Sequence, residues 1–274
     1  MGNMPGRVDI GLCWTHDQLP PGEVAERLRR LGFDGIELWP LPLKAHGAQA
    51  WAEALSSNGL RCLQLCPYFD FMDGPESLAK SRTTLDRYLE SARILDCHRL
   101  RTFTGPPWGE GVVNAPEATP EQWADTIEGL RQLCEAAGPE VELCLECHEG
   151  GLSEDSASAL RLLEGVNRGN LTVNLQLPLV GEPWEVSLDR LGPHTTHAHV
   201  HNYLDVVGGP MTWLDDQVGV FDWAPVVHRI TNELGRDLTL SVEHPDHGRG
   251  DDLWETARRD GKHLQALRYA QANR

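Results

Sequence analysis

Short apolar segments alternate along the whole chain with longer segments whose apolar residues recur every three or four positions. The short segments have the length and apolar content of buried strands, and they cover residues 8–14, 35–39, 61–65, 99–104, 141–148, 171–175, 195–201 and 237–243. The longer segments fit amphipathic helices at residues 23–31, 49–57, 75–95, 119 onward, 153 or 155 onward, 187–191, 222–234, and 251 or 252 to 270. The pattern predicts eight repeats of a strand followed by a helix.

Capping residues support the helix boundaries. Gly32 and Gly235 follow the last periodic residue of their segments, as glycines do at helix C-termini. Thr119, Pro120 and Gln122 combine an N-cap, a proline at the first helical position and a glutamine at the third. Eight strand and helix repeats at a spacing of about 30 residues fit a closed (β/α)8 barrel better than an open sheet. With no linker or low-complexity stretch in the sequence, we expect one α/β domain over residues 1–274.

The composition narrows the class of protein. The chain of 274 residues is 40% hydrophobic, with no uncharged apolar run near the ~18 residues of a membrane span. The first residues include no apolar segment of signal-peptide length, so we expect a cytoplasmic protein that does not bind membranes. Seven cysteines lie mostly inside apolar runs, which predicts buried thiols. A net charge of −17 would repel a polyanion and argues against nucleic acid as a partner.

Ionisable and amide side chains gather at the ends of the predicted strands. In a (β/α)8 barrel the carboxyl ends of the strands form one mouth, where catalytic groups meet. The candidates are Glu37 on the second strand, Glu146 and His148 on the fifth, Asn174 and Gln176 on the sixth, His197, His199 and His201 on the seventh, and Glu243 on the eighth.

The stretch around Glu146 is the densest of these. Alternation along a strand puts Glu146 and His148 on the same face. A carboxylate buried there would cost several kcal/mol unless charged or hydrogen-bonding groups from elsewhere partner it.

Two carboxylates and an imidazole from separate strands form a ligand set suited to a divalent cation. We expect Glu146, His199 and Glu243 to be ligands, with Gln176 as a neutral fourth. This mixture of oxygen and nitrogen donors suits Mn²⁺ first, with Mg²⁺, Co²⁺ or Zn²⁺ as alternatives. Such a cation would polarise a substrate oxygen.

The sequence resembles the xylose-isomerase-like barrel family, which includes sugar-phosphate isomerases and epimerases and, more distantly, endonuclease IV. The resemblance extends over almost the whole chain. It rests on four stretches in order: FDGIELWP at 33–40, E-x-H-x-G at 146–150, HAHVHN at 197–202 and SVEH at 241–244.

The resemblance implies one divalent metal held by a Glu after strand five, an Asp after six, a His after seven and a Glu after eight. Glu146, His199 and Glu243 match this pattern, whereas Gln176 stands where the Asp is usual. A neutral amide there should weaken a site for a hard cation. His201 also replaces a Lys that often follows the ligand His by two residues.

The resemblance further implies proton transfer at a carbon next to a metal-polarised carbonyl. Glu146 and Glu243 would act on opposite faces of a small carbohydrate substrate, one removing a proton and the other returning it. The candidates for binding this substrate are Glu37, Trp14, Trp108, His148, His197, His201 and Arg249. Of these, Arg249 lies among glycines in a stretch that an ordinary turn explains better than a phosphate site does.

Other functions fit the same residues. An inosose-dehydratase-like lyase would use the same proton abstraction, and a carbohydrate-binding barrel without activity would follow from loss of the metal through Gln176. A phosphodiesterase like endonuclease IV would need several metals, for which His46 is a lone additional ligand. A homo-oligomer is compatible with the fold.

Overall fold

The computed structural model describes residues 5–72, 74–106, 111–179, 181–243 and 252–272. Its eight barrel strands close in the order β1-β10-β7-β6-β5-β4-β3-β2, which confirms the predicted (β/α)8 barrel. The chain divides into two units, residues 1–63 with 195–274 and residues 64–194, and each is described by itself. The prediction of a single domain stays a prediction. Among the described residues, no helix is long and apolar enough to cross a lipid bilayer.

The first unit, residues 1–63 with 195–274, contains four parallel strands paired in the order β2-β1-β10-β7. Every residue in them is buried, as expected for parallel strands covered on both faces. Their bounds are β1 (Val8–Trp14), β2 (Gly35–Leu38), β7 (Thr195–Val200) and β10 (Leu238–Val242).

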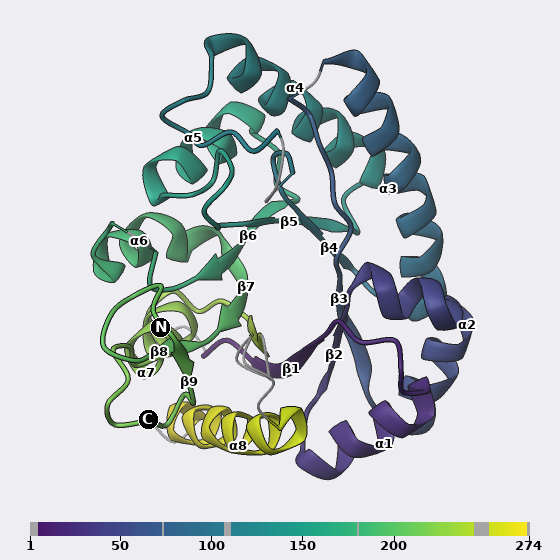
Figure 1. Ribbon diagram of the computed structural model, residues 1–274, viewed down its shortest axis with the longest axis vertical. Coiled ribbons are helices and arrows are strands. Elements are labelled where there is room, and N and C mark those ends of the chain that lie inside the picture. The colour runs from purple at the N-terminus through teal and green to yellow at the C-terminus, as the bar shows by residue number, and fades with distance from the viewer. Residues whose placement is uncertain (1–4, 73, 107–110, 180, 244–251, 273–274) are drawn as a thin grey trace. The chain divides into compact units, whose positions relative to one another are not determined.

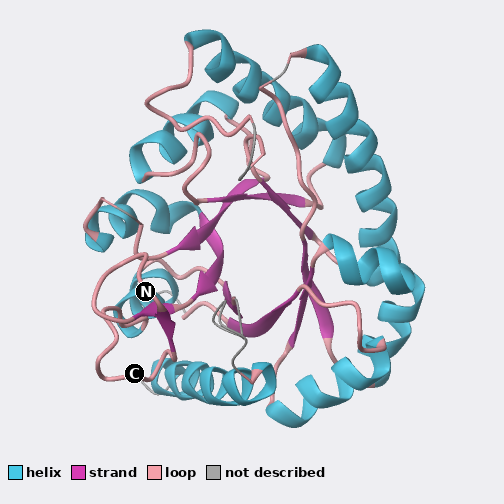
Figure 2. Cartoon of the chain, in the orientation of Figure 1, coloured by secondary structure: helices cyan, strands magenta, loops and turns pink. Residues whose placement is uncertain are grey.

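Helices cover the outer face of these strands, and α8 runs beside β1 (Figure 2). Trp14 on β1 packs against Trp254 on α8 with ring centroids 5.5 Å apart. The helices of this unit are α1 (Pro21–Leu31), α2 (Pro40–Ser57), α7 (Ala224–His228), the π-helical turn η2 (Arg229–Glu233) and α8 (Leu253–Ala272).

The second unit, residues 64–194, has β4, β5 and β6 paired in parallel, and the end of β3 (Arg61–Leu65) joins β4 through Leu65 and Leu100. Helices α3 to α6 lie outside these strands (Figure 1). The bounds are α3 (Pro75–Leu95), β4 (Arg99–Thr102), α4 (Pro120–Ala137), β5 (Glu142–Glu146), α5 (Ser156–Val166), β6 (Leu171–Gln176), α6 (Trp184–Leu191) and the 3-10 turn η1 (Gly192–His194).

Local capping explains several boundaries. At α4, the Thr119 side chain accepts from the Gln122 backbone and the Gln122 side chain accepts from the Thr119 backbone, which confirms the predicted capping box. At α5 the cap is Asp155, which accepts from the backbone N–H of Ser158. Ser153, the alternative cap, instead donates to the carbonyl of Glu146 at 2.7 Å.

The structure corrects the predicted elements in three places. Helix α2 begins at Pro40, nine residues before the predicted start at 49. Prolines in a first turn give up no helical hydrogen bond, so they can begin the helix. Gly47, at φ 77°, then interrupts the helical backbone. The predicted helix 222–234 is the short α7 followed by the π-helical η2. The sequence also missed a small antiparallel pair, β8 (Asn202–Tyr203) with β9 (Met211–Thr212).

Candidate functional site

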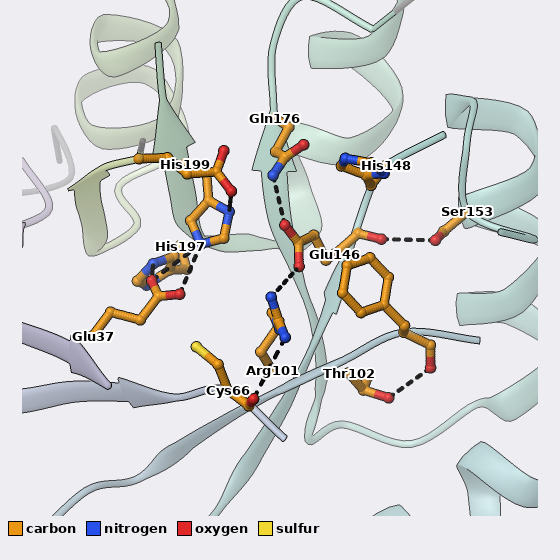
Figure 3. A network of polar contacts seen from close by, with 12 residues as sticks. Glu37, Cys66, Arg101, Thr102, Glu146, His148, Ser153, Gln176, His197 and His199 are labelled. Carbon is orange, nitrogen blue, oxygen red and sulfur yellow. Dashed lines mark hydrogen bonds and ion pairs between the residues drawn. The ribbon is translucent and has the colours of Figure 1, made fainter. Parts of the chain in front are cut away.

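Two groups of buried polar side chains stand at the carboxyl ends of the strands, one in each unit. The histidine cluster of the first unit consists of Glu37, His197, His199, His201 and Glu243. The arginine cluster of the second unit consists of Arg101, Glu146 and Gln176. Figure 3 labels Glu37, His197 and His199 of the histidine cluster and all three members of the arginine cluster.

Glu37 lies between two imidazoles (Figure 3). One of its carboxylate oxygens is 2.8 Å from Nε2 of His197, and the two oxygens are 2.9 and 3.1 Å from Nε2 of His199. All three side chains are fully buried. Burial alone would raise the pKa of Glu37, but the two imidazoles outweigh it and hold that pKa well below its usual value.

The other ring nitrogen of His199 faces Glu243. Nδ1 of His199 is 3.2 Å from Oε1 of Glu243, and Nδ1 of His201 is 3.6 Å from Oε2 of the same carboxylate. Nε2 of His201 meets the Tyr203 hydroxyl at 3.1 Å. His199 thus touches one carboxylate with each nitrogen, and Glu243 stands between two imidazoles, as Glu37 does.

A thiol borders the histidine cluster. Ligand atoms of Cys13, Glu37 and His199 all lie within 4.8 Å of one another. Burial raises the pKa of the Cys13 thiol well above its ordinary value, and the Glu37 carboxylate raises it further. All seven cysteines are buried thiols outside disulfide bonds, and buried thiols are what the sequence predicted.

In the arginine cluster, donors from two neighbouring strands hold Glu146. Nη1 of Arg101, on β4, is 3.1 Å from Oε2 of Glu146, and Nε2 of Gln176, on β6, donates to Oε1 at 2.5 Å. Arg101 and Glu146 are 0% and 1% exposed, so this is a buried ion pair. The predicted need of Glu146 for a charged partner is therefore met by Arg101.

Arg101 is enclosed by aromatic rings and backbone. Its guanidinium lies 4.5 Å from the ring centroid of Tyr68 and 4.7 Å from that of Phe103, and Nη2 donates to the carbonyl of Cys66 at 3.4 Å. Burial alone would lower its pKa, but the Glu146 carboxylate raises it above the ordinary value. The sequence did not single out Arg101; the available signal was a charged residue inside the buried strand RLRT.

The remaining predicted residues lie in other surroundings. Strand β5 ends at Glu146, two residues before the predicted end at His148. His148 is part-exposed, and its ring meets Phe103 edge-on. Trp14 is buried against Trp254, in the packing between β1 and α8. Trp108 and Arg249 lie outside the described residues.

The donor atoms of the histidine cluster fit a divalent cation. When Nε2 of His199 donates to Glu37, the unprotonated Nδ1 presents its lone pair toward the carboxylate of Glu243. Two such acceptors 3.2 Å apart repel each other unless a proton or a cation lies between them. Imidazole and carboxylate are also ligands that Mn²⁺ and Zn²⁺ accept.

Known proteins resemble this chain over most of its length. The 3-dehydroshikimate dehydratase of Bacillus anthracis is 22% identical over 205 residues, which cover 70% of this chain and 69% of that protein. A xylose isomerase-like TIM barrel protein from Mycobacterium smegmatis, solved in complex with magnesium, has a TM-score of 0.72 at 18% identity and covers 98% of both chains. D-psicose 3-epimerase from Clostridium cellulolyticum has a TM-score of 0.72 at 16% identity, covering 96% of this chain and 99% of its own.

A family model gives the assignment directly. The model described as xylose isomerase-like TIM barrel matches residues 25–267, which include all members of both clusters. The chain therefore belongs to the xylose isomerase-like TIM barrel family.

Proposed function

We propose that the protein is a divalent-metal-dependent enzyme that moves a proton at a carbon next to a carbonyl, as an isomerase or epimerase of a sugar or sugar phosphate. The observation that carries the proposal is the contact of the buried Glu243 with Nδ1 of His199 at 3.2 Å, at the ends of adjacent strands. Family membership and the epimerase of the same fold support it.

The cation would be held by Glu146, His199 and Glu243, with Gln176 beside them. These four residues are the ligands that the sequence predicts at the ends of strands five to eight. When bound, the cation supplies polarisation of a substrate carbonyl or hydroxyl oxygen. Family relatives bind magnesium and zinc, and Mn²⁺ remains our first choice for this ligand set.

The protein's own side chains provide the proton transfer. Glu243 is the proposed base, and the Nδ1 atoms of His199 and His201 lie beside its carboxylate on two sides. Glu146 is the proposed partner that returns the proton, oriented by Arg101 and Gln176. Two glutamates on different strands suit attack on opposite faces of a substrate carbon, as epimerisation requires.

A dehydratase is the second candidate. It would remove the same kind of proton and then expel a hydroxide from the next carbon. The observation that favours it is the sequence similarity to the 3-dehydroshikimate dehydratase. A small carbohydrate or related polyhydroxylated acid is the proposed substrate, while a cytoplasmic location and a homo-oligomer stay predictions.

The test is proton exchange in heavy water. The purified protein, loaded with Mn²⁺, is incubated in D₂O with a panel of ketoses, inososes, their phosphates and 3-dehydroshikimate. We expect deuterium to enter the carbon next to the carbonyl of one class, detected by NMR. The variant Glu243→Gln should abolish exchange, whereas Glu26→Gln, at a half-exposed ion pair on α1, should not change it.

The products separate the two reactions. A changed configuration or carbonyl position supports the isomerase or epimerase, and loss of water supports the dehydratase. Bound metal without exchange in any substrate class, or equal exchange in Glu243→Gln, would overturn the proposal and favour a carbohydrate-binding barrel without activity.

A further inference from the structure

Glu37 is enclosed by ring nitrogens and stands behind the proposed ligand His199. Both of its oxygens are occupied by Nε2 atoms of His197 and His199, and its side chain is 0% exposed. A carboxylate in this state has no surface on which to contact a substrate. Its effect must therefore pass through the imidazoles.

The contact with Glu37 gives one nitrogen of His199 the role of hydrogen-bond donor. A carboxylate accepts hydrogen bonds, so Nε2 of His199 must donate to Glu37. In the neutral imidazole, Nδ1 then becomes the acceptor, and this is the nitrogen that faces Glu243 at 3.2 Å. A metal-bound histidine commonly donates its other N–H to a carboxylate, which orients the ring and makes the ligand nitrogen more basic.

We propose that Glu37 is a positioning residue that commits Nε2 of His199 to hydrogen bonding and presents Nδ1 to the cation. The inference rests on the cation site of the proposed function. It reassigns Glu37 from the substrate pocket to support of a ligand. His197 completes the arrangement, because its own Nε2 contact at 2.8 Å anchors the Glu37 carboxylate from a second direction.

The contact between Glu37 and His199 joins two strands that are not neighbours in the sheet. Glu37 lies on β2 and the two histidines lie on β7, with β1 and β10 between these strands in the pairing order. The carboxylate must therefore reach across the interior end of the unit, not along its surface. The strand fixes the Cα of His199, and the contact with Glu37 restricts the two side-chain torsions, χ1 and χ2, that set the orientation of the ring.

The test replaces the carboxylate by an amide of nearly the same shape. In Glu37→Gln the amide NH₂ meets an imidazole N–H, so one histidine must turn or change tautomer. We expect Mn²⁺ affinity, measured by titration calorimetry, to fall roughly 10- to 100-fold. The matched control is Glu142→Gln, a part-buried strand carboxylate paired with Arg99 at 2.9 Å, which should leave the affinity within twofold of wild type.

The second readout is the tautomer itself. Nitrogen-15 NMR of the wild type loaded with diamagnetic Zn²⁺ should show His199 protonated at Nε2 and unprotonated at Nδ1, and Glu37→Gln should lose this pattern. If that variant does not fold, Glu37→Asp, which keeps the charge but shortens the side chain, should still weaken Mn²⁺ binding. An Nδ1–H tautomer in the Zn²⁺-loaded wild type, or unchanged affinity in a folded Glu37 variant, would overturn the inference.

These outcomes are separate from those of the proposed function. Failure of every carbohydrate to exchange deuterium leaves the tautomer and affinity results standing. Conversely, if the wild type is active but Glu37→Gln binds Mn²⁺ as tightly as the wild type does, the positioning role alone is refuted.

Discussion

The histidine cluster and the arginine cluster both surround buried glutamates, but with partners of different kinds. Glu37 and Glu243 contact imidazoles, whereas Glu146 contacts a guanidinium and an amide. Imidazoles gain and lose protons near neutral pH, whereas arginine keeps its charge. The histidine cluster therefore offers nitrogen ligands to a cation, while the arginine cluster supplies a constant positive charge beside one carboxylate.

The largest expected effect comes from breaking the ion pair of the arginine cluster. Arg101→Met removes the guanidinium from a carboxylate that is 1% exposed, so the free energy of unfolding should fall by about 3–5 kcal/mol. Urea denaturation followed by circular dichroism measures this change.

The matched control lies two residues earlier on the same strand. Arg99 pairs with Glu142, whose side chain is 33% exposed, so Arg99→Met should cost only about 1 kcal/mol. Equal losses of unfolding free energy in the two variants would show that burial does not make the ion pair of the arginine cluster contribute more than a more exposed one.

A buried carboxyl outside both clusters provides a reference whose hydrogen-bond donor is a backbone N–H. Asp260 on α8 accepts the backbone N–H of Leu214 at 2.9 Å. Burial raises its pKa to about 7, although that hydrogen bond opposes the shift. The folded protein therefore holds a proton that the unfolded chain releases near pH 4, so the contribution of Asp260 to stability falls as the pH rises from about 4 to 7.

Replacing this carboxyl by an amide should remove that pH dependence. Asp260→Asn is expected to be more stable than wild type at pH 8 by about 2–4 kcal/mol, with the difference vanishing toward pH 4. Urea denaturation across this pH range measures it. A difference that stays constant with pH would contradict the assigned cause.

The smallest expected effect comes from Gln176→Asp, which places a second carboxylate in the arginine cluster. Gln176→Asp removes the N–H that now donates to Glu146 and adds a negative charge beside it. Mn²⁺ should bind about tenfold more tightly, equivalent to about 1.4 kcal/mol, because hard cations favour carboxylate oxygen. Calorimetric titration measures the affinity.

The same variant has an opposite effect without metal. Two carboxylates close together repel each other, so the thermal midpoint in a chelator should fall below that of wild type. Weaker Mn²⁺ binding by a folded Gln176→Asp would indicate that Arg101, not the missing carboxylate, governs the affinity of this cluster.

Local sequence determined most of the barrel. Apolar runs bounded by glycines and caps placed the eight strands, and the Thr119 capping box and the stop at Gly32 were predicted directly. These features depend on residues within about four positions of each other, because caps and helical periodicity are local interactions. The position of Glu146, His199 and Glu243 at strand ends followed from the same pattern.

Only the tertiary structure decided what these side chains contact. Glu37 meets His199 across 162 positions of sequence, and Arg101 meets Glu146 across the register of β4 with β5. Nothing local distinguishes a strand-end glutamate held by imidazoles from one held by a guanidinium, because the choice depends on which strands become neighbours and how they are aligned. The sequence determined which polar groups this protein buries, and the folded strands determined their partners because an ionised group inside a protein is stabilised by whatever the closed structure brings within hydrogen-bonding distance.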